Sequence, residues 1–196
     1  MIPRRDELVR SVAAAWRLFL GDPRAMAGFD LTVEGFWRSF AVIVPIAPFY
    51  FAAALVERQL RLTGSVAEAF GEGRFFAVKA AIMAIDWVAL PIVLALVARP
   101  LGIARNYAGF IVARNWASLL IVIPDTAVAV AFGLGLIGTD IAGFLLLAVL
   151  VVILRYRYVI ARIALGAGIG FAIAITFADL LLSLIINAGF NRLFLD

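Results

Sequence analysis

Three aspartates, Asp86, Asp125 and Asp179, each lie near the middle of a separate long apolar run of this 196-residue chain. An ionised carboxylate in the hydrocarbon of a bilayer costs about 2.5–3.5 kcal/mol even on a lenient insertion scale. A chain that keeps three of them either pairs them inside a helix bundle or uses them for binding or transfer. The three residues are therefore the candidate ion or proton site of this sequence.

The apolar runs determine the predicted fold class. Hydrophobic residues make up 65% of the chain, charged residues only 15%, and the mean hydropathy is +1.09. Soluble domains are about 45–50% apolar and about 25% charged, so the sequence predicts an all-α, polytopic membrane helix bundle. Five runs are long enough to cross the hydrocarbon as helices. They lie near residues 39–56, 76–98, 108–137, 140–160 and 168–189.

Two of these runs contain proline. Pro45 and Pro48 in the first run predict a kink or a locally unwound turn. Pro124 in the third run allows either one kinked helix, near 113–137, or two half-helices that meet at the proline. One helix is the favoured interpretation, because about 30 residues are too few for two crossings of about 20 residues each. An unwound turn beside Asp125 would resemble the broken-helix cation sites of secondary transporters.

Residues 6–20 predict an amphipathic helix before the first span, with Leu8, Val12, Trp16 and Phe19 on one face. Two interpretations of this helix stay open. It lies in the membrane interface with its arginines toward anionic headgroups, or it packs on the cytoplasmic end of the bundle. The predicted organisation is a cytoplasmic N-terminal region at 1–38, a five-helix transmembrane domain at 39–190 and a short tail at 191–196.

Arginine and lysine are divided unevenly between the two sides that five spans define. Twelve lie on the side of the N-terminus and five on the other side. The positive-inside rule then predicts a cytoplasmic N-terminus and a periplasmic C-terminus. The use of 16 arginines against one lysine suggests a bacterial protein of the inner membrane. This orientation signal explains the excess of basic over acidic residues, so no nucleic-acid partner is expected.

On the far side, Ser65 and Glu68 match a capping box, which predicts the start of a short helix.

The chain has neither cysteine nor histidine. Disulfides, thiolate nucleophiles, imidazole bases and the usual zinc or haem ligands are thereby excluded. The segment Gly138-Thr139-Asp140 does not form the GxGD motif of intramembrane aspartyl proteases, and a phosphate loop would need a preceding strand. We therefore expect no catalytic residue, no metal site, no cofactor and no enzymatic activity.

The last apolar run has two distinct faces. One carries small residues at every fourth position, which allows another helix to approach closely. The other carries a polar stripe, which cannot face lipid and faces either other helices or a water-filled cavity. The small face comprises Gly166, Gly170, Ala174 and Ala178, and the polar stripe comprises Thr176, Asp179, Ser183 and Asn187.

Three acids at similar depth would repel one another if all were ionised, so at least one should be protonated or paired with arginine. Arg114 and Arg155 are the candidate cations. Arg155 also belongs, with Arg157 and Arg162, to a basic stretch at the end of the fourth run. This stretch predicts a membrane anchor or a patch that binds anionic lipid headgroups or a partner. Arg114 and the two residues after it are assigned to the same cytoplasmic collar.

The span layout over about 39–190 resembles the Yip1-like membrane proteins, with five closely spaced spans after a cytoplasmic amphipathic region. The phrases GDP at 21–23 and EGFWRSF at 34–40 also look like those of alphaproteobacterial integral membrane proteins. The resemblance implies a non-enzymatic membrane organiser or an accessory subunit of a larger assembly. It transfers no functional residue.

Two functions are expected from these observations. The first is a non-catalytic integral membrane protein that associates with other membrane proteins, with itself, or with anionic lipids of the bilayer. The alternative is a small proton- or cation-coupled transporter or channel that uses Asp86, Asp125 and Asp179. The alternative predicts that these three carboxylates converge on one solvated cavity near the midplane.

Overall fold

The computed structural model describes residues 5–63 and 71–195. In this part of the chain all regular structure is helical, and five helical segments are long and apolar enough to cross a membrane, as predicted. The capping box predicted from Ser65 and Glu68 lies outside the described residues. The elements are α1 (Arg5–Phe19), the 3₁₀-helix η1 (Pro23–Gly28), α2 (Val33–Phe40), α3 (Ile43–Thr63), α4 (Glu72–Val97), α5 (Tyr107–Gly133), α6 (Thr139–Ala164) and α7 (Ile169–Phe194).

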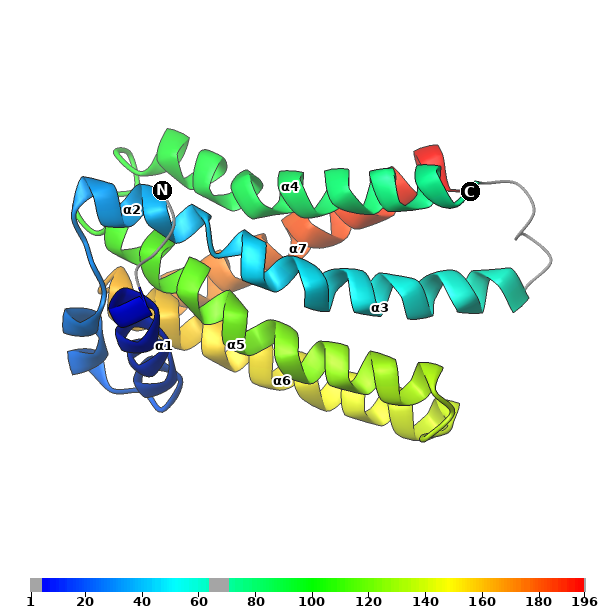
Figure 1. The fold of residues 1–196 in the computed structure, drawn as a ribbon. Coiled ribbons are helices and arrows are strands. Elements are labelled where there is room, and N and C mark those ends of the chain that lie inside the picture. The colour runs from blue at the N-terminus through cyan, green and yellow to red at the C-terminus, as the bar shows by residue number, and fades with distance from the viewer. Residues whose placement is uncertain (1–4, 64–70, 196) are drawn as a thin grey trace.

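The five long helices are arranged as a ring (Figure 1). In this ring α3 packs on α5, α5 on α6, α6 on α7 and α7 on α4, and α4 returns to α3. The helices α1 and α2 lie at one end of the ring, together with the α4–α5 and α6–α7 connections. The α5–α6 connection and the end of α7 lie at the other end. We call these the α1 end and the far end.

The outer surface of the ring is apolar. Leu96, Phe144 and Ile185, from three different helices, are each about 70% exposed or more. In the most apolar 18-residue stretch of each long segment, only 17–22% of the residues are buried inside the protein. An exposed apolar surface of this extent is unfavourable in water and favourable in contact with lipid. In each helix the backbone N–H and C=O groups are hydrogen-bonded to one another, as the hydrocarbon of a bilayer requires. The chain is therefore a multi-pass membrane protein.

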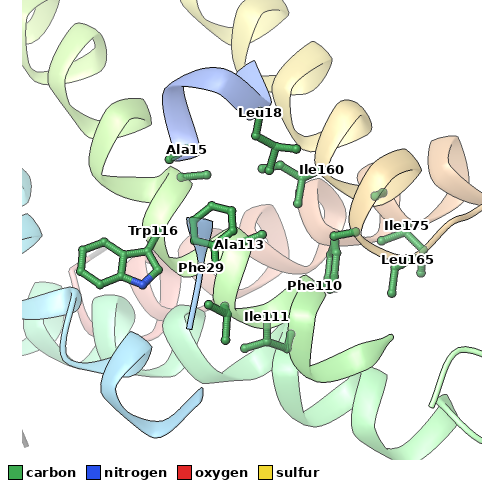
Figure 2. Close-up of a cluster of buried hydrophobic side chains, with 14 of the residues drawn as sticks. Ala15, Leu18, Phe29, Phe110, Ile111, Ala113, Trp116, Ile160, Leu165 and Ile175 are labelled. Carbon is green, nitrogen blue, oxygen red and sulfur yellow. The ribbon is translucent and has the colours of Figure 1, made fainter. Parts of the chain in front are cut away.

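The largest cluster of buried side chains lies toward the α1 end (Figure 2). Phe110, Ile111 and Trp116 of α5 are enclosed there by Leu18 of α1 and Ile160 of α6. Because lipid tails are as apolar as these side chains, the cluster stabilises the bundle mainly by close packing rather than by removal from water. The α1 end is thus the tightly packed end of the ring.

The N-terminal helix packs on the bundle mainly through small residues, and of the predicted apolar face only Val12 and Phe19 are partly buried against the core. Its small residues allow a close approach to α5, α6 and η1. A Cβ added at Gly28 of η1 would lie only 2.8 Å from the Cβ of Ala14. Leu8 and Trp16, which belong to the predicted apolar face, are 40% and 53% exposed. The buried face comprises Glu7, Ser11, Ala14, Ala15 and Leu18.

The break predicted at the prolines of the first span occurs a few residues before them. The helix α2 ends at Phe40 and α3 begins at Ile43. Pro45 therefore lies in the first turn of α3, where the missing N–H would have no partner within the helix. Pro48 lies inside α3 and does not end it. The first span thus consists of two helices separated by a short turn.

The turn between α2 and α3 is held by side chains of other spans. The amide of Val44 donates to Ala41 at 3.1 Å, so the Phe40 carbonyl loses the partner that a continuous helix would supply. The indole Nε1 of Trp87, on α4, donates to this carbonyl at 3.2 Å. One residue earlier, Asn115 of α5 donates to the Ser39 hydroxyl at 3.0 Å. The break is therefore fixed by α4 and α5.

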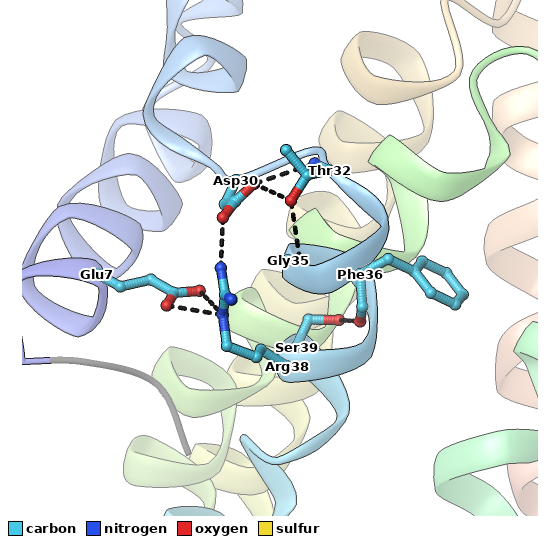
Figure 3. A network of polar contacts seen from close by, with 7 residues as sticks. All are labelled: Glu7, Asp30, Thr32, Gly35, Phe36, Arg38 and Ser39. Carbon is cyan, nitrogen blue, oxygen red and sulfur yellow. Dashed lines mark hydrogen bonds and ion pairs between the residues drawn. The ribbon is translucent and has the colours of Figure 1, made fainter. Parts of the chain in front are cut away.

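An ionic network joins α1 to α2 (Figure 3). Arg38 contacts Glu7 of α1 at 3.0 Å and Asp30 at 2.5 Å. Asp30 accepts hydrogen bonds from the Thr32 hydroxyl at 2.7 Å and from its amide at 3.0 Å. These bonds, aided by the Arg38 charge, hold the pKa of Asp30 below its usual value. Gly35 is required beside them, since an added Cβ would lie 2.3 Å from the Asp30 carbonyl oxygen.

Two of the predicted domain boundaries fall inside helices. The boundary between residues 38 and 39 falls inside α2, which is part of the first candidate span Val33–Leu62. The predicted tail at 191–196 is mostly helical, because α7 continues to Phe194. The N-terminal region packs directly on α5 and α6, and so it forms one unit with the bundle.

The third span is a single helix with Pro124 inside it, as favoured from the sequence. It begins at Tyr107, earlier than predicted, and this shift corrects one assignment. Arg114, Asn115 and Trp116 were placed in a cytoplasmic collar, but all three are buried within α5. The run is helical from Tyr107 because its buried polar groups find partners on other helices.

Candidate functional site

A polar cavity of about 290 Å³ lies in the centre of the ring, and all five long helices contribute to its lining. Each polar side chain comes from the inward face of its helix. Apolar side chains such as Ile82, Met83 and Val122 complete the wall. The polar lining residues are Tyr50, Asp86, Trp87, Arg114, Ser118, Asp125, Arg157, Ser183 and Asn187.

Asp179 is buried between two arginines that belong to two other helices. Its Oδ1 accepts from Nη2 of Arg114 at 2.9 Å, and its Oδ2 accepts from Nη1 of Arg157 at 2.6 Å. The side chains of Asp179 and Arg114 are 7% and 9% exposed, and that of Arg157 is 22% exposed. Each carboxylate oxygen thus has a charged donor, which is the arrangement that a buried carboxylate needs.

The cluster of Arg114, Arg157 and Asp179 lies toward the α1 end of the bundle. Arg114 is seven residues after the start of α5, and Arg157 is seven residues before the end of α6. At 1.5 Å per residue both lie about 10 Å inside their helices. Both arginines also line the central cavity. Asp179 itself contacts a much smaller cavity, of about 10 Å³, behind them.

The pairing of an aspartate with arginine was expected, but one of the two named cations differs. Arg114 is such a partner, whereas Arg157 takes the place expected for Arg155. Arg155 donates instead to the Phe19 carbonyl at 2.9 Å and lies over the ring of Phe19. In an α-helix Arg155 and Arg157 point about 200° apart, so one of them faces inward when the other faces outward. That angle was the signal available in the sequence.

The remaining member of the predicted basic stretch, Arg162, donates to the Ala167 carbonyl just after α6. It therefore closes the α6–α7 connection. Arg155 and Arg162 lie on one face of α6, seven residues apart, and Arg157 lies on another. The predicted collar of three arginines is thus divided into two outer side chains and one inner side chain.

Asp86 and Asp125 face the central cavity without a hydrogen-bond or ion-pair partner among the described residues. Asp86 lies near the middle of α4, within electrostatic range of Tyr50 and Arg157. Asp125 is the more exposed of the two. The helix remains continuous at the neighbouring proline, so the unwound turn considered from the sequence does not form. Two of the three predicted carboxylates share the cavity, and the third lies behind its arginines.

The charges around the cavity do not balance. Asp86, Asp125 and Asp179 would carry three negative charges when ionised, against two positive charges on Arg114 and Arg157. An unbalanced charge in a membrane-embedded site is costly. A bound proton or a bound monovalent cation would remove it. The site therefore has the composition of a cation or proton site with one surplus carboxylate.

The polar stripe of the last span faces the interior of the bundle. Ser183 and Asn187 line the central cavity. Thr176 is buried beside Asp179, and its hydroxyl donates to the Ala172 carbonyl one turn earlier. Asn187 donates in the same way to the Ser183 carbonyl. Among the four stripe residues only Asp179 bonds to another helix, so the stripe mainly supplies polar groups to cavities.

The small-residue face of the last span does not pack against any described helix of this chain. Gly170, Ala174 and Ala178 are exposed, and a Cβ added at Gly170 would meet no atom within 4 Å. Gly166 lies before α7 and has a φ of +63°, a left-handed conformation that glycine adopts after a helix end. The face predicted for helix packing is therefore available only to lipid or to another protein.

A second polar cluster lies at the far end and was missed from the sequence. Lys79 is almost fully buried, and its Nζ contacts Glu57 of α3 at 2.7 Å and Asn191 of α7 at 3.3 Å. Its ammonium also lies 5.5 Å from the centre of the Phe75 ring. Glu57 is shared with Arg61 at 3.1 Å. The cluster joins α3, α4 and α7 at the far end.

No protein-family model matches the chain, and comparisons with curated proteins and with solved structures give no match. The resemblance to Yip1-like proteins therefore depends on the span layout described above.

Proposed function

We propose that the chain binds a monovalent cation or a proton in its central cavity and carries it across the bilayer. The observation that carries this proposal is the surplus carboxylate. Asp179 is neutralised by Arg114 and Arg157, whereas Asp86 and Asp125 face about 290 Å³ of polar space without such a partner in the described part of the chain. Intramembrane acids that face a cavity are typical of ion and proton pathways.

The direct test is a flux assay in proteoliposomes that contain a pH-sensitive dye. We expect the wild-type protein to dissipate an imposed proton gradient, and Asp86→Asn and Asp125→Asn to reduce the rate at least tenfold. Asparagine keeps the shape of the side chain but cannot carry the negative charge. Asp140→Asn is the matched control, because Asp140 is exposed in the first turn of α6 and outside the cavity. Wild-type rates equal to those of empty liposomes would contradict the proposal.

A second function is favoured by the exposed small face of α7. We propose that Gly170, Ala174 and Ala178 contact another helix, either of a second copy or of a partner membrane protein, in which case the chain is an organiser or accessory subunit. The absence of native cysteine permits a clean test. Ala174→Cys should form an intermolecular disulfide in membranes, whereas Leu147→Cys, on the exposed face of α6, should not. Equal crosslinking at both sites would count against this function.

We also propose a bacterial inner-membrane location with a cytoplasmic N-terminus. Without Arg114 and Arg157, which are used inside the bundle, the ratio of basic residues on the two sides is still ten to five. Reporter fusions at Met1 and after Asp196 should report opposite compartments. The same compartment for both ends would exclude the orientation and the five-span topology together.

The outer face of α1 supports an interfacial position for this helix. Trp16 and Leu8 are exposed on it, and tryptophan favours the headgroup level. Trp16 and Phe19 also border an apolar groove of about 360 Å³ between α1, α5 and α6. We propose that lipid covers this groove and that exposed arginines nearby, such as Arg155, favour anionic headgroups. Trp16→Ala should weaken binding of the protein to anionic lipid in native mass spectrometry, and an unchanged lipid count would contradict the placement.

A further inference from the structure

We infer that the ligand of the central cavity is a small organic ammonium ion, with a positive nitrogen and short alkyl groups. This inference rests on the proposed function and adds the chemical class of the cation. It follows from four properties of the cavity wall: its charge, its aromatic rings, its apolar area and its size.

The charge of the wall suits one positive group. Asp86 and Asp125 are the acids that face the space, and the two arginines beyond them are occupied by Asp179. The surplus of one negative charge selects a monovalent cation over an anion and over a divalent cation. Any ammonium ion supplies that single charge.

The aromatic residues distinguish an ammonium ion from a metal ion. Trp87 and Tyr50 line the same cavity as Asp86. The indole of Trp87 is held in place, because its Nε1 donates to the Phe40 carbonyl at 3.2 Å. A tryptophan face next to carboxylates is a favourable surface for alkylated ammonium groups, whose charge is spread over the carbons attached to nitrogen.

The cavity carries oxygen-bearing side chains, but the described residues include no group of three or more acidic side chains that could hold a metal ion. Hard metal cations take about six oxygen ligands, and the broken helices of ion transporters supply backbone carbonyls for this purpose. Here α5 is continuous past Asp125. Pro124 frees the Leu120 carbonyl, but Leu120 borders the apolar groove beside α1 and does not line this cavity. Side chains such as Met83, Ile121 and Val122 face the cavity instead. Those apolar groups would contact the alkyl part of an organic cation.

The cavity has the size of a small-molecule site. Its volume of about 290 Å³ is at the lower end of the roughly 300–1,000 Å³ that ligand sites occupy. This volume accommodates a cation such as tetraethylammonium and leaves a single alkali-metal ion without most of its coordination. We therefore use tetraethylammonium as the probe.

The test is calorimetric titration of the full-length protein in detergent with tetraethylammonium chloride, with sodium chloride as the comparison. We expect saturable binding of tetraethylammonium, loss of that binding in Asp86→Asn, and at least tenfold weaker binding in Tyr50→Leu and in Trp87→Leu. Trp37→Leu is the control, because Trp37 is exposed on α2 and does not line the cavity. Tyr50→Leu leaves the Trp87 hydrogen bond intact, so it keeps the test valid if Trp87→Leu fails to fold.

The outcomes separate this inference from the proposed function. Proton or Na⁺ flux that depends on Asp86, without tetraethylammonium binding or inhibition, would overturn the inference and leave the function standing. Tetraethylammonium binding that is unchanged in Asp86→Asn and in Tyr50→Leu would place the ligand elsewhere and also overturn it. Absence of both flux and binding would remove the function and the inference together.

Discussion

The substitution Asp179→Asn tests whether the buried ion cluster holds the bundle together. Removal of the carboxylate leaves Arg114 and Arg157 beside each other with no negative charge at the 2.9 Å and 2.6 Å positions. Breaking a buried ion pair by removing one partner costs about 3–5 kcal/mol. Arg114, at 9% side-chain exposure, is less relieved by the cavity than Arg157, at 22%. We expect a loss of about 3–5 kcal/mol in the free energy of unfolding.

Two further variants give the expected order of stability. Arg157→Gln keeps the pair of Arg114 and Asp179, so it should cost only the one charged hydrogen bond, about 1.5–3 kcal/mol. The triple variant Arg114→Met, Arg157→Met and Asp179→Leu removes all three charges. Replacing a whole buried ion cluster by apolar side chains is often neutral, so the triple variant should recover most of the stability lost in Asp179→Asn.

Reversible unfolding in mixed micelles of mild detergent and dodecyl sulfate, followed by tryptophan fluorescence, measures these differences. If Asp179→Asn unfolds within about 1 kcal/mol of the wild type, the two guanidiniums are satisfied without the carboxylate, and the ion cluster does not hold the bundle together. A triple variant that is no more stable than Asp179→Asn would also contradict the expected order. In that case the contribution of Asp179 would be one of shape rather than of charge.

Three other predictions concern the helix contacts. Gly133→Ala should destabilise the protein by about 1–3 kcal/mol, because the new methyl would lie 2.7 Å from a methyl of Val56. The double variant Gly133→Ala and Val56→Ala should recover this stability in the same unfolding assay. At the far end, Glu57→Gln should cost about 3 kcal/mol, because the buried Lys79 ammonium would lose its carboxylate partner and keep only Asn191 and the Phe75 ring. Lys79→Met should cost only about 1 kcal/mol, because Glu57 is 38% exposed and keeps a second cation. Equal costs for the two variants would contradict this explanation. The pKa of Asp30 is lowered in the folded protein, so the ionised carboxylate stabilises the fold at neutral pH and this contribution is lost as the pH falls below about 4. The melting temperatures of the wild type and of Asp30→Asn should therefore differ at neutral pH and converge in acid.

The span layout was predictable because hydropathy is a local property. Each long apolar run became one helix, and the run around Pro124 stayed a single helix, because two crossings need more residues than it has. The pairing of an aspartate with arginine followed from the cost of burying three carboxylates. Neither prediction required knowledge of how the helices are rotated.

The predictions that were wrong depend on rotation and on contacts between distant helices. The apolar face of α1 did not indicate that the helix would pack on the bundle mainly through Ala14 and Ala15, which allow closer approach. Large side chains such as Trp16 gain no comparable contact in a membrane protein, where lipid is as apolar as the core. Likewise, the choice of Arg157 over Arg155 is decided by which face of α6 is turned toward Asp179 on α7. Hydropathy does not record that orientation.

The structure changes which aspartate should be tested for flux. The sequence predicted Asp86, Asp125 and Asp179 together as the candidate ion site, and of the three only Asp179 belongs to the polar stripe of the last span. Its two oxygens are both used by arginines, so a neutral substitution there would alter folding and charge together, and a loss of flux would not identify its cause. Asp86 faces the cavity and accepts no hydrogen bond from the described residues, so Asp86→Asn changes the charge of the cavity and leaves the contacts between helices in place. The distinction between a structural carboxylate and a candidate ligand-binding one is therefore made by the partners of each side chain, and it selects Asp86 and Asp125 rather than Asp179 for the flux assay.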